Sequence, residues 1–337
     1  MKSTLFLAPT SRRLGSSDIT VSPLGLGCWP IGGKMSLFGR PDSYGTVDDE
    51  ESIRAIHAAT AEGVTFFDTA DCYGGGHSER VLGRALRGAS SEIVIATKAG
   101  YLFDPESRNI HGESHDPAYY RAACEASLRR LGRDVIDLFQ VHLWSAPAEA
   151  IAPIVDALER LKTDGLIRAY GWSTDHLETI STAAQSGRLC TLQHEMSVFH
   201  RADDALRFCR EHHLGSIVRS PLAMGLLSGK YRAETSFSVD DVRGTGFDWV
   251  RYFKDGKPVP AFLTRLEAIR EILTSGGRTL VQGALAYIWG KSAVSVPIPG
   301  FRNKKQAVEN ARAMHFGPLS PAQVAEIDAT LDQLAAG

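Results

Sequence analysis

The chain has 337 residues, of which 43% are hydrophobic and 23% charged, and its formal net charge is −2. This size and balance are typical of a globular protein that buries a large core without disulfide or metal staples. The small net charge gives no reason to expect a nucleic-acid partner. The sequence contains neither a signal-peptide core nor a membrane-length apolar run, so we expect a cytoplasmic protein with no membrane partner.

Short apolar runs alternate with helical patterns along most of the chain. A hairpin is expected first, at residues 12–22, with the turn-forming Ser16-Ser17-Asp18 near its tip. Eight apolar runs then predict strands at 24–27, 64–69, 92–98, 135–142, 167–173, 191–196, 216–220 and 293–297. Helical patterns occur at 48–62, 78–86, 118–131, 151–163, 176–185, 203–212, 262–273, 279–289 and 304–314.

This alternation without a break predicts one α/β domain over residues 1–337, built as a (β/α)8 TIM barrel from about 23 to 316. An open, doubly wound sheet would give the same alternation, but eight units favour closure. Residues 228–260 form a long segment after the seventh strand and are expected to be a lid. Residues 320–334 predict an additional C-terminal helix, with a serine cap followed by proline.

The cysteines and histidines do not predict a metal site. The five cysteines are scattered without a Cys-x-x-Cys pair, which favours free thiols in a reducing compartment. His111 and His115 are four residues apart, but Gly112 and Pro117 favour a surface loop over a metal-binding helix.

Four polar residues fall at or just after the ends of three consecutive predicted strands, where barrels place their chemistry. Asp68, Lys98 and His142 end these strands, and Tyr73 lies five residues after Asp68. Each alone would more often be a cap, a surface charge or a packing residue. Together, a lysine held by the aspartate would lower the tyrosine's pKa, and the histidine would hydrogen-bond a carbonyl oxygen. The set predicts a tyrosine general acid for C=O reduction.

The same stretches resemble the aldo-keto reductase superfamily over about residues 13–334. Phe66-Phe67-Asp68-Thr69-Ala70-Asp71-Cys72-Tyr73-Gly74 resembles its second-strand signature, and 96–98 and 137–142 resemble its lysine and histidine strands. The resemblance implies a catalytic tetrad of Asp68, Tyr73, Lys98 and His142, with Tyr73 as general acid. It also implies NAD(P)H-dependent reduction of the carbonyl group of a small-molecule substrate, an aldehyde or ketone, to an alcohol.

The resemblance extends to the segments that hold the cofactor. Ser173 and Gln193 would contact the nicotinamide carboxamide, residues 220–231 would clamp the pyrophosphate, and residues 298–310 would hold the adenosine. The implied cofactor contacts are Cys28, Trp29, Asp68, Ser173, Gln193, Arg219, Ser220, Pro221, Leu222, Gly225, Leu227, Lys230, Gly300, Arg302, Gln306, Glu309 and Asn310.

Three positions depart from the family pattern in ways that affect the choice of cofactor. Arg219 replaces an aromatic residue that often stacks on the nicotinamide, although a guanidinium can also stack. Gly300 and Gln306 replace basic residues that bind the 2′-phosphate in some members, and Arg302 could take over that role. NADP(H) is therefore the expected cofactor, and NAD(H) stays open.

Trp29, Tyr101 and Trp144 are expected to ring an aromatic, largely apolar substrate pocket, with lid packing as the alternative role of each. Two other functions remain open. One is an NAD-dependent sugar or alcohol dehydrogenase on the same scaffold. The other, less favoured, is a cofactor-binding regulatory subunit resembling potassium-channel accessory proteins. Nothing in the sequence indicates an oligomer, although it leaves one open.

Overall fold

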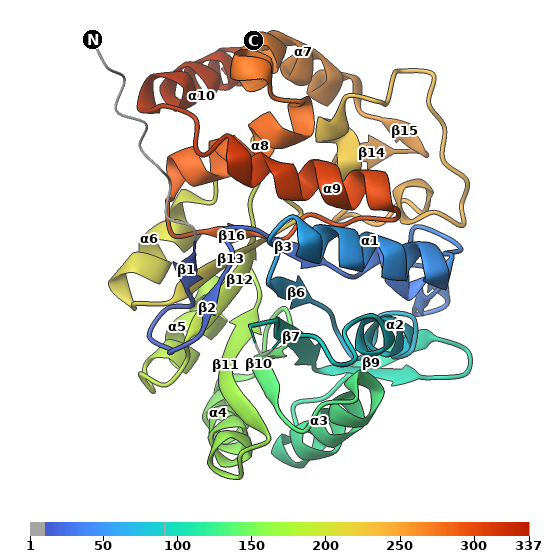
Figure 1. The fold of residues 1–337 in the computed structure, drawn as a ribbon, viewed down its shortest axis with the longest axis vertical. Coiled ribbons are helices and arrows are strands. Elements are labelled where there is room, and N and C mark those ends of the chain that lie inside the picture. The colour runs from blue at the N-terminus through green and yellow to red at the C-terminus, as the bar shows by residue number, and fades with distance from the viewer. Residues whose placement is uncertain (1–10, 91, 337) are drawn as a thin grey trace.

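The computed structural model describes residues 11–90 and 92–336. Its centre is an eight-stranded parallel sheet in which each strand pairs with the next one along the chain. The strands are β3 (Gly25–Gly27), β6 (Phe66–Asp68), β7 (Val94–Ala99), β10 (Ile136–Val141), β11 (Ile167–Ser173), β12 (Thr191–Glu195), β13 (Gly215–Arg219) and β16 (Val296–Pro297). A parallel bridge between Gly27 and Gly300 brings the chain after β16 back to β3. The sheet is thus nearly closed, and the predicted TIM barrel is confirmed (Figure 1).

Helices surround this barrel as the sequence predicts. They are α1 (Asp49–Ala61), α2 (His77–Ala85), α3 (Pro117–Leu131), α4 (Ala148–Thr163), α5 (Leu177–Ala184), α6 (Asp203–Glu211), α7 (Pro260–Thr274), α8 (Leu280–Lys291), α9 (Lys304–Arg312) and α10 (Pro321–Ala336). Helices α7 and α10 pack against each other and against α8, beyond the ring formed by the other helices (Figure 1).

Local signals explain where these helices begin and end. The Asp48 carboxylate caps α1 by accepting hydrogen bonds from the backbone N–H groups of Glu50 and Glu51. Gly132 ends α3 in the left-handed conformation, with a φ of 64°. Ser320 Oγ accepts a hydrogen bond from the backbone N–H of Gln323, which confirms the predicted start of the C-terminal helix.

The N-terminal hairpin closes the bottom of the barrel. It consists of β1 (Arg12–Arg13) and β2 (Thr20–Val21), and its apolar side chains pack onto the side chains inside the barrel. Gly15, at the turn, has a φ of 56°, and a Cβ there would lie 2.1 Å from the Cys190 carbonyl oxygen. The close approach of the hairpin to the strand ends therefore requires glycine.

A second sheet lies outside the barrel and was not predicted. It contains β4 (Ser36–Leu37), β5 (Arg40–Pro41), β8 (Tyr101–Asp104) and β9 (Asn109–Glu113), in the order β5-β4-β9-β8. The prediction of a loop around His111 was therefore wrong, because this residue lies in β9. Strands of two to five residues carry too little pattern to be recognised, and β4 pairs with β9 across about 70 residues of chain.

The long segment 228–260 is ordered and contacts the second sheet. It carries a small hairpin, β14 (Phe253–Lys254) and β15 (Lys257–Pro258). The backbone N–H of Val242 donates to the Ser43 carbonyl at 2.8 Å, and Arg40 Nη2 donates to the Thr245 carbonyl at 2.7 Å. The Arg40 guanidinium also lies 4.1 Å from the centre of the Phe247 ring. Two segments far apart in the chain thus join near the carboxyl ends of the barrel strands.

Candidate active site

Lys98 is the centre of a buried polar cluster inside the barrel. Its side chain is fully buried, and Asp68, at the end of the neighbouring strand β6, is 2% exposed. The Lys98 ammonium donates to Asp68 Oδ1 at 2.6 Å, to the Thr69 carbonyl at 2.7 Å and to Tyr73 Oη at 3.3 Å. All three of its N–H groups have acceptors, which is what makes a buried ammonium tolerable.

Tyr73 and His142 complete the group of four residues singled out in the sequence. Tyr73 lies in a turn after β6 where Gly74 has a φ of 61°, and a Cβ on that glycine would lie 1.9 Å from the Gly32 carbonyl oxygen. His142 follows β10, and its ring lies edge-on to that of Tyr73, with 5.8 Å between the ring centres. The structure therefore brings Asp68, Tyr73, Lys98 and His142 together at the carboxyl ends of the strands.

Burial determines the protonation states of the Tyr73 phenol and the His142 imidazole. It raises the pKa of Tyr73 well above the usual value for a phenol, and the nearby Asp68 charge raises it further. The expectation that Lys98 would lower this pKa was wrong in its net direction, because the loss of solvent outweighs the neighbouring cation. Burial also lowers the pKa of His142 well below its ordinary value, with further lowering by the charges of Lys98 and Arg219. At neutral pH the phenol carries its proton and the imidazole is uncharged.

Two glutamines hold the second oxygen of Asp68. Gln193 Nε2 donates to Asp68 Oδ2 at 2.7 Å, and Gln140 Nε2 donates to the same atom at 3.2 Å. Ser173 Oγ donates to Gln193 Oε1 at 3.2 Å, so both residues expected at the carboxamide connect to Asp68. Sequence analysis missed Gln140. Its signal was a polar residue within an apolar strand, two positions before His142 and therefore on the same face.

Aromatic rings gather around Tyr73 and His142. Tyr101 lies 4.9 Å from His142 between ring centres, and Trp29 lies 6.3 Å from Tyr73. Trp29 also contacts Tyr44, at 5.0 Å, and Trp249 of the long segment, at 6.2 Å. Trp249 belongs to the segment that was expected to be a lid. Tyr44 was not predicted at the pocket, because only folding brings segment 33–47 to Trp29.

Trp144 does not join this aromatic group. Its side chain is 53% exposed, and no ring contact links it to Trp29 or Tyr101 among the residues that the structure describes. The structure therefore brings together two of the three aromatic residues predicted to line the pocket.

The segment expected to clamp the pyrophosphate has an unusual backbone. Ser220, Ala223 and Met224 have positive φ values of 54°, 49° and 55°, and Gly225 and Gly229 follow at 89° and 70°. Such strained residues cluster at ligand clamps, and successive backbone N–H groups in these conformations form concavities that bind anions. This geometry fits a phosphate-bearing cofactor. Pro221 and Leu227 are buried here, Leu222 is partly buried and Lys230 is exposed.

Arg219 ends β13 beside this segment. Its guanidinium is hydrogen-bonded to Asp175 Oδ2 and lies 3.8 Å from Glu195 Oε2. Arg251, from the long segment, also reaches Glu195 Oε2, at 3.2 Å. The positive charge of Arg219 is therefore balanced by two carboxylates.

The residues expected at the adenosine lie in the loop after β16 and along α9. Arg302 donates its Nη2 hydrogen to the Thr46 carbonyl at 2.8 Å, and its backbone N–H donates to Gln306 Oε1 at 2.8 Å. Asn310 Nδ2 donates to the Gly300 carbonyl at 3.2 Å, which holds the loop after β16. Glu309 is half-buried beside Asn310. The exposed side chains here are those of Arg302, Lys304 and Lys305.

Cys28 occupies a different environment from the one expected. Its side chain is fully buried, and Sγ lies 3.8 Å from the Leu26 carbonyl oxygen. All five cysteines are buried and unpaired. The Cys28 thiol belongs to the core, and its backbone N–H and carbonyl are hydrogen-bonded to the Asp68 carbonyl and to Ser78 Oγ.

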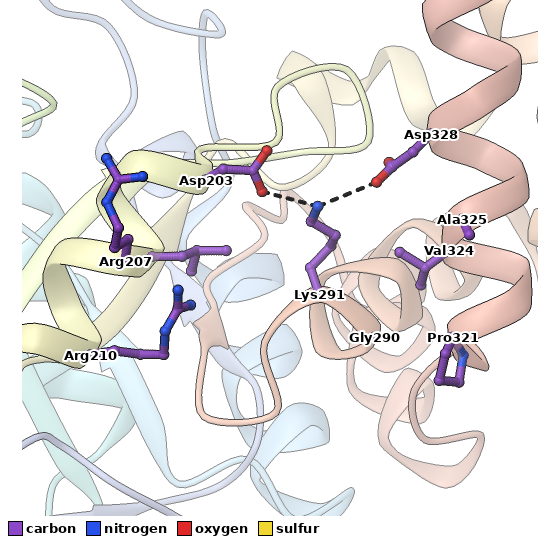
Figure 2. Close-up of a pocket in the computed structure, with 10 residues that line it drawn as sticks. Asp203, Arg207, Arg210, Gly290, Lys291, Pro321, Val324, Ala325 and Asp328 are labelled. Atoms are coloured by element: carbon purple, nitrogen blue, oxygen red, sulfur yellow. Dashed lines mark hydrogen bonds and ion pairs between the residues drawn. The ribbon is translucent and has the colours of Figure 1, made fainter.

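Two hollows on the outside of the barrel are separate from this cluster. One, of about 430 Å³, lies between α6, α8 and α10, where Lys291 pairs with Asp203 at 3.0 Å and Asp328 at 3.3 Å (Figure 2). The other, of about 510 Å³, lies beside the C-terminal ends of α2 and α3 and is lined by six arginines. Neither contains a residue of the polar cluster.

The described residues contain no helix long and apolar enough to cross a membrane. Among the same residues, no three His, Cys, Asp or Glu side chains gather in a way that could hold a metal ion.

A nearly closed eight-stranded barrel with ionisable side chains at the carboxyl ends of its strands is the architecture of a TIM-barrel enzyme. The chain belongs to the aldo/keto reductase family, whose family model matches residues 23–332. It is thus an oxidoreductase of a family that reduces carbonyl groups with NADP(H), and the resemblance noted in the sequence is confirmed.

Individual relatives extend over nearly the whole chain. The NADP(+) aldo-keto reductase yakc of Schizosaccharomyces pombe is 32% identical over 332 residues, covering 96% of this chain and 91% of that protein. The structure of the glycerol dehydrogenase AKR11B4 from Gluconobacter oxydans matches with a TM-score of 0.82 and 29% identity, covering 97% of each chain. The holo form of aldo-keto reductase AKR11C1 from Bacillus halodurans matches with a TM-score of 0.76 and 27% identity, covering 95% of this chain and 96% of that one.

Proposed function

We propose that this protein reduces aldehyde or ketone carbonyls to alcohols with NADPH, and that Tyr73 is the general acid. The observation that carries the proposal is the contact of 3.3 Å between Tyr73 Oη and the Lys98 ammonium, which Asp68 holds in place. A protonated phenol beside a fixed cation can release its proton while the cation stabilises the phenolate that forms.

His142 has the complementary role in this proposal. Because its imidazole is neutral, it retains one N–H that can donate a hydrogen bond to the substrate oxygen and orient the carbonyl towards Tyr73. The surrounding rings of Trp29 and Tyr101 exclude water and strengthen these electrostatic interactions. The aromatic lining suits a small organic carbonyl compound.

Several described residues fit a bound nicotinamide cofactor, which would supply the hydride. Ser173 and Gln193 would hold the carboxamide, and the strained segment 220–230 would hold the pyrophosphate. Residues 300–310 would hold the adenosine. The exposed side chains of Arg302, Lys304 and Lys305 give the start of α9 three cations, which favours the 2′-phosphate of NADPH over NADH.

Titration of the purified protein with NADPH and, separately, NADH, followed by fluorescence, tests the cofactor. We expect NADPH to bind at least ten-fold more tightly, and the substitution of Arg302 by alanine to reduce this preference. Arg232→Ala changes an exposed arginine outside these segments and serves as the control. Equal binding of the two cofactors would contradict the choice of NADPH, and binding of neither would refute the enzymatic proposal.

Alcohol oxidation with the same residues is the second candidate. It is favoured by the likeness in fold to a glycerol dehydrogenase, at a TM-score of 0.82. In that direction Tyr73 would have to be present as the phenolate to accept the alcohol proton, a form that Lys98 would stabilise. Initial rates with NADP(+) and glycerol, compared with those with NADPH and glyceraldehyde, would determine which direction the protein favours.

A further inference from the structure

The second of the two outer hollows, of about 510 Å³, has an unusual concentration of positive charge. Its polar lining residues are Arg80, Arg84, Arg87, Arg129, Arg130 and Arg133, and the others are glycine, leucine and alanine. Among the described residues, the lining includes neither a carboxylate nor an aromatic ring. A hollow of this size is within the range of small-molecule sites, so we asked what these arginines could bind.

The close approach of two helix ends brings the arginines together. Helices α2 and α3 lie side by side (Figure 1). A Cβ on Gly83 of α2 would lie 2.5 Å from the carbonyl oxygen of Leu131, the last residue of α3, so this approach requires glycine. Arginines from the carboxyl ends of both helices therefore line the same hollow.

Two of the six guanidinium groups already have carboxylate partners. Arg130 Nε donates to Glu79 Oε2 at 2.5 Å, and Arg84 Nη2 donates to Glu50 Oε1 at 2.6 Å. No ion pair within residues 11–90 and 92–336 engages the remaining four, which are Arg80, Arg87, Arg129 and Arg133. The hollow thus holds four cations without a counter-charge from the protein.

Arg133 has a donor for which the fold provides no acceptor. Its Nη2 atom is shielded from solvent, and no group in the described part of the chain accepts a hydrogen bond from it. An unsatisfied buried donor costs free energy, and in native proteins it calls for an explanation such as a bound ion or water. Burial also lowers the pKa of Arg80, and repulsion from the nearby Arg130 and Arg108 lowers it further.

The helix ends account for part of this charge only. The carboxyl end of an α-helix carries about half a negative charge, so the ends of α2 and α3 together offset about one cation. Subtracting it from the four unpaired cations leaves a surplus of about three positive charges. An anion from outside the protein would offset this surplus.

The guanidinium groups indicate the chemistry of that anion. Guanidinium forks bind phosphate through pairs of hydrogen bonds, and each phosphate group brings up to about two negative charges and three acceptor oxygens. A few linked phosphate groups would therefore match the surplus within a small hollow. Because the described lining offers no aromatic ring on which a base could stack, a nucleic-acid strand fits this hollow less well.

We propose that this hollow is a binding site for a small oligophosphate, an anion made of linked phosphate groups, held between the carboxyl ends of α2 and α3. The site is separate from the segment 220–230 proposed for the cofactor pyrophosphate, and it contains no residue of the polar cluster around Lys98. It therefore stands independently of the proposed carbonyl reduction.

Isothermal titration calorimetry with tripolyphosphate tests the proposal. The protein is first saturated with NADPH, so that the phosphate positions proposed for the cofactor are occupied. We expect one tripolyphosphate to bind per chain, about ten-fold or more tightly than orthophosphate at the same ionic strength. The double variant Arg129→Gln/Arg133→Gln should weaken this binding by about ten-fold or more, because it removes two unpaired cations.

Arg210→Gln is the matched control. Arg210 is likewise an exposed arginine in the last turn of a helix, α6, but it lines the other hollow, which also contains carboxylates (Figure 2). This variant should bind tripolyphosphate as wild type does. Thermal unfolding without the anion verifies that each variant is folded. Arg87→Gln, at an exposed position, should also weaken binding and provides a second measurement if the double variant folds poorly.

Three results would overturn the proposal. The first is unchanged affinity for tripolyphosphate in both the double variant and Arg87→Gln. The second is binding that disappears once NADPH is present, since the anion would then occupy the cofactor site. The third is equally tight binding of orthophosphate or of an oligoglutamate peptide, which would show that the hollow does not select linked phosphate groups.

Discussion

Gln193 Nε2 donates a hydrogen bond of 2.7 Å to Asp68 Oδ2, across 125 residues of sequence. The bond joins strand β12 to strand β6 through the barrel interior. Because Ser173 Oγ donates to the same glutamine, the side chains expected at the nicotinamide and those around Tyr73 form one buried hydrogen-bond network. A change on the cofactor side of this network should therefore affect the Asp68 carboxylate.

Replacing Gln193 by leucine should lower both the stability of the folded protein and its affinity for the cofactor. The loss of one donor raises the pKa of the buried Asp68 further, because Gln193 is one of the groups that hold it down. We expect the free energy of unfolding to fall by about 1–3 kcal/mol at pH 7 in urea denaturation. Gln140→Leu, the control, removes the other glutamine donor but not the link to Ser173, and should lose stability without losing NADPH affinity. Equal loss of affinity in both variants would argue against a role for Gln193 at the cofactor.

Tyr73→Phe should bind NADPH with unchanged affinity but lower kcat by about 10²–10⁴-fold, the usual contribution of a general acid. Since burial raises the pKa of Tyr73 above its ordinary value near 10, the wild-type rate of reduction should show no loss from tyrosine ionisation between about pH 6 and 9. Tyr120→Phe, a fully buried tyrosine of α3, is the control and should keep its activity. Wild-type turnover by the Tyr73 variant would show that another group supplies the proton.

The buried carboxyl group of Asp42 should make stability depend on pH. Its folded-state pKa of about 7 lies above the unfolded value of about 3.9, so the folded protein binds the proton more tightly. This contribution to stability is fully present below about pH 4 and is lost as pH rises through about 7. Asp42→Asn removes the titration, so at pH 8 the variant should be more stable than wild type by up to about 4 kcal/mol.

Urea denaturation of both proteins at pH 4 and pH 8 measures this effect. The advantage of the asparagine variant should be present at pH 8 and much smaller at pH 4. The same difference in stability between the two proteins at pH 4 and pH 8 would mean that the pKa of Asp42 is not raised.

Arg243 should hold the long segment 228–260 in place. Its side chain is 8% exposed, forms two hydrogen bonds with the Asp241 carboxylate, and lies 3.9 Å from the centre of the Phe237 ring. Arg243→Leu leaves Asp241 without its cation and should cost about 3 kcal/mol, the lower end of the range for breaking a buried ion pair. Limited proteolysis should then cleave within 228–260 faster than in wild type.

Arg243→Lys keeps the charge but loses the planar stacking, and should give intermediate cleavage. Arg232→Leu, an exposed arginine of the same segment, should be cleaved as slowly as wild type. Identical cleavage of the Arg243→Leu variant and wild type would indicate that other contacts hold the segment.

Much of the architecture was predictable from local pattern. Strands covered on both faces are continuous apolar runs, and caps such as Asp48 and Ser320 mark helix starts within a few residues. The eighth strand begins at Val296, three residues later than predicted, and α4 begins at Ala148, three residues earlier. Asp68, Lys98 and His142 were identifiable because a barrel gathers the carboxyl ends of its parallel strands at one end. Residues at the ends of consecutive strands therefore lie close together.

Only the tertiary structure decided which groups surround that meeting point. The positions of Gln140, Tyr44 and Asp42 depend on pairings between segments far apart in the chain. Two-residue strands such as β4 and β5 carry no periodicity from which such pairings could be predicted. The direction of the Tyr73 pKa shift was likewise beyond the sequence. The sequence shows which charged residue types are present near the phenol. The shift is dominated by the removal of water around the phenol, and the extent of that removal depends on how the folded chain packs.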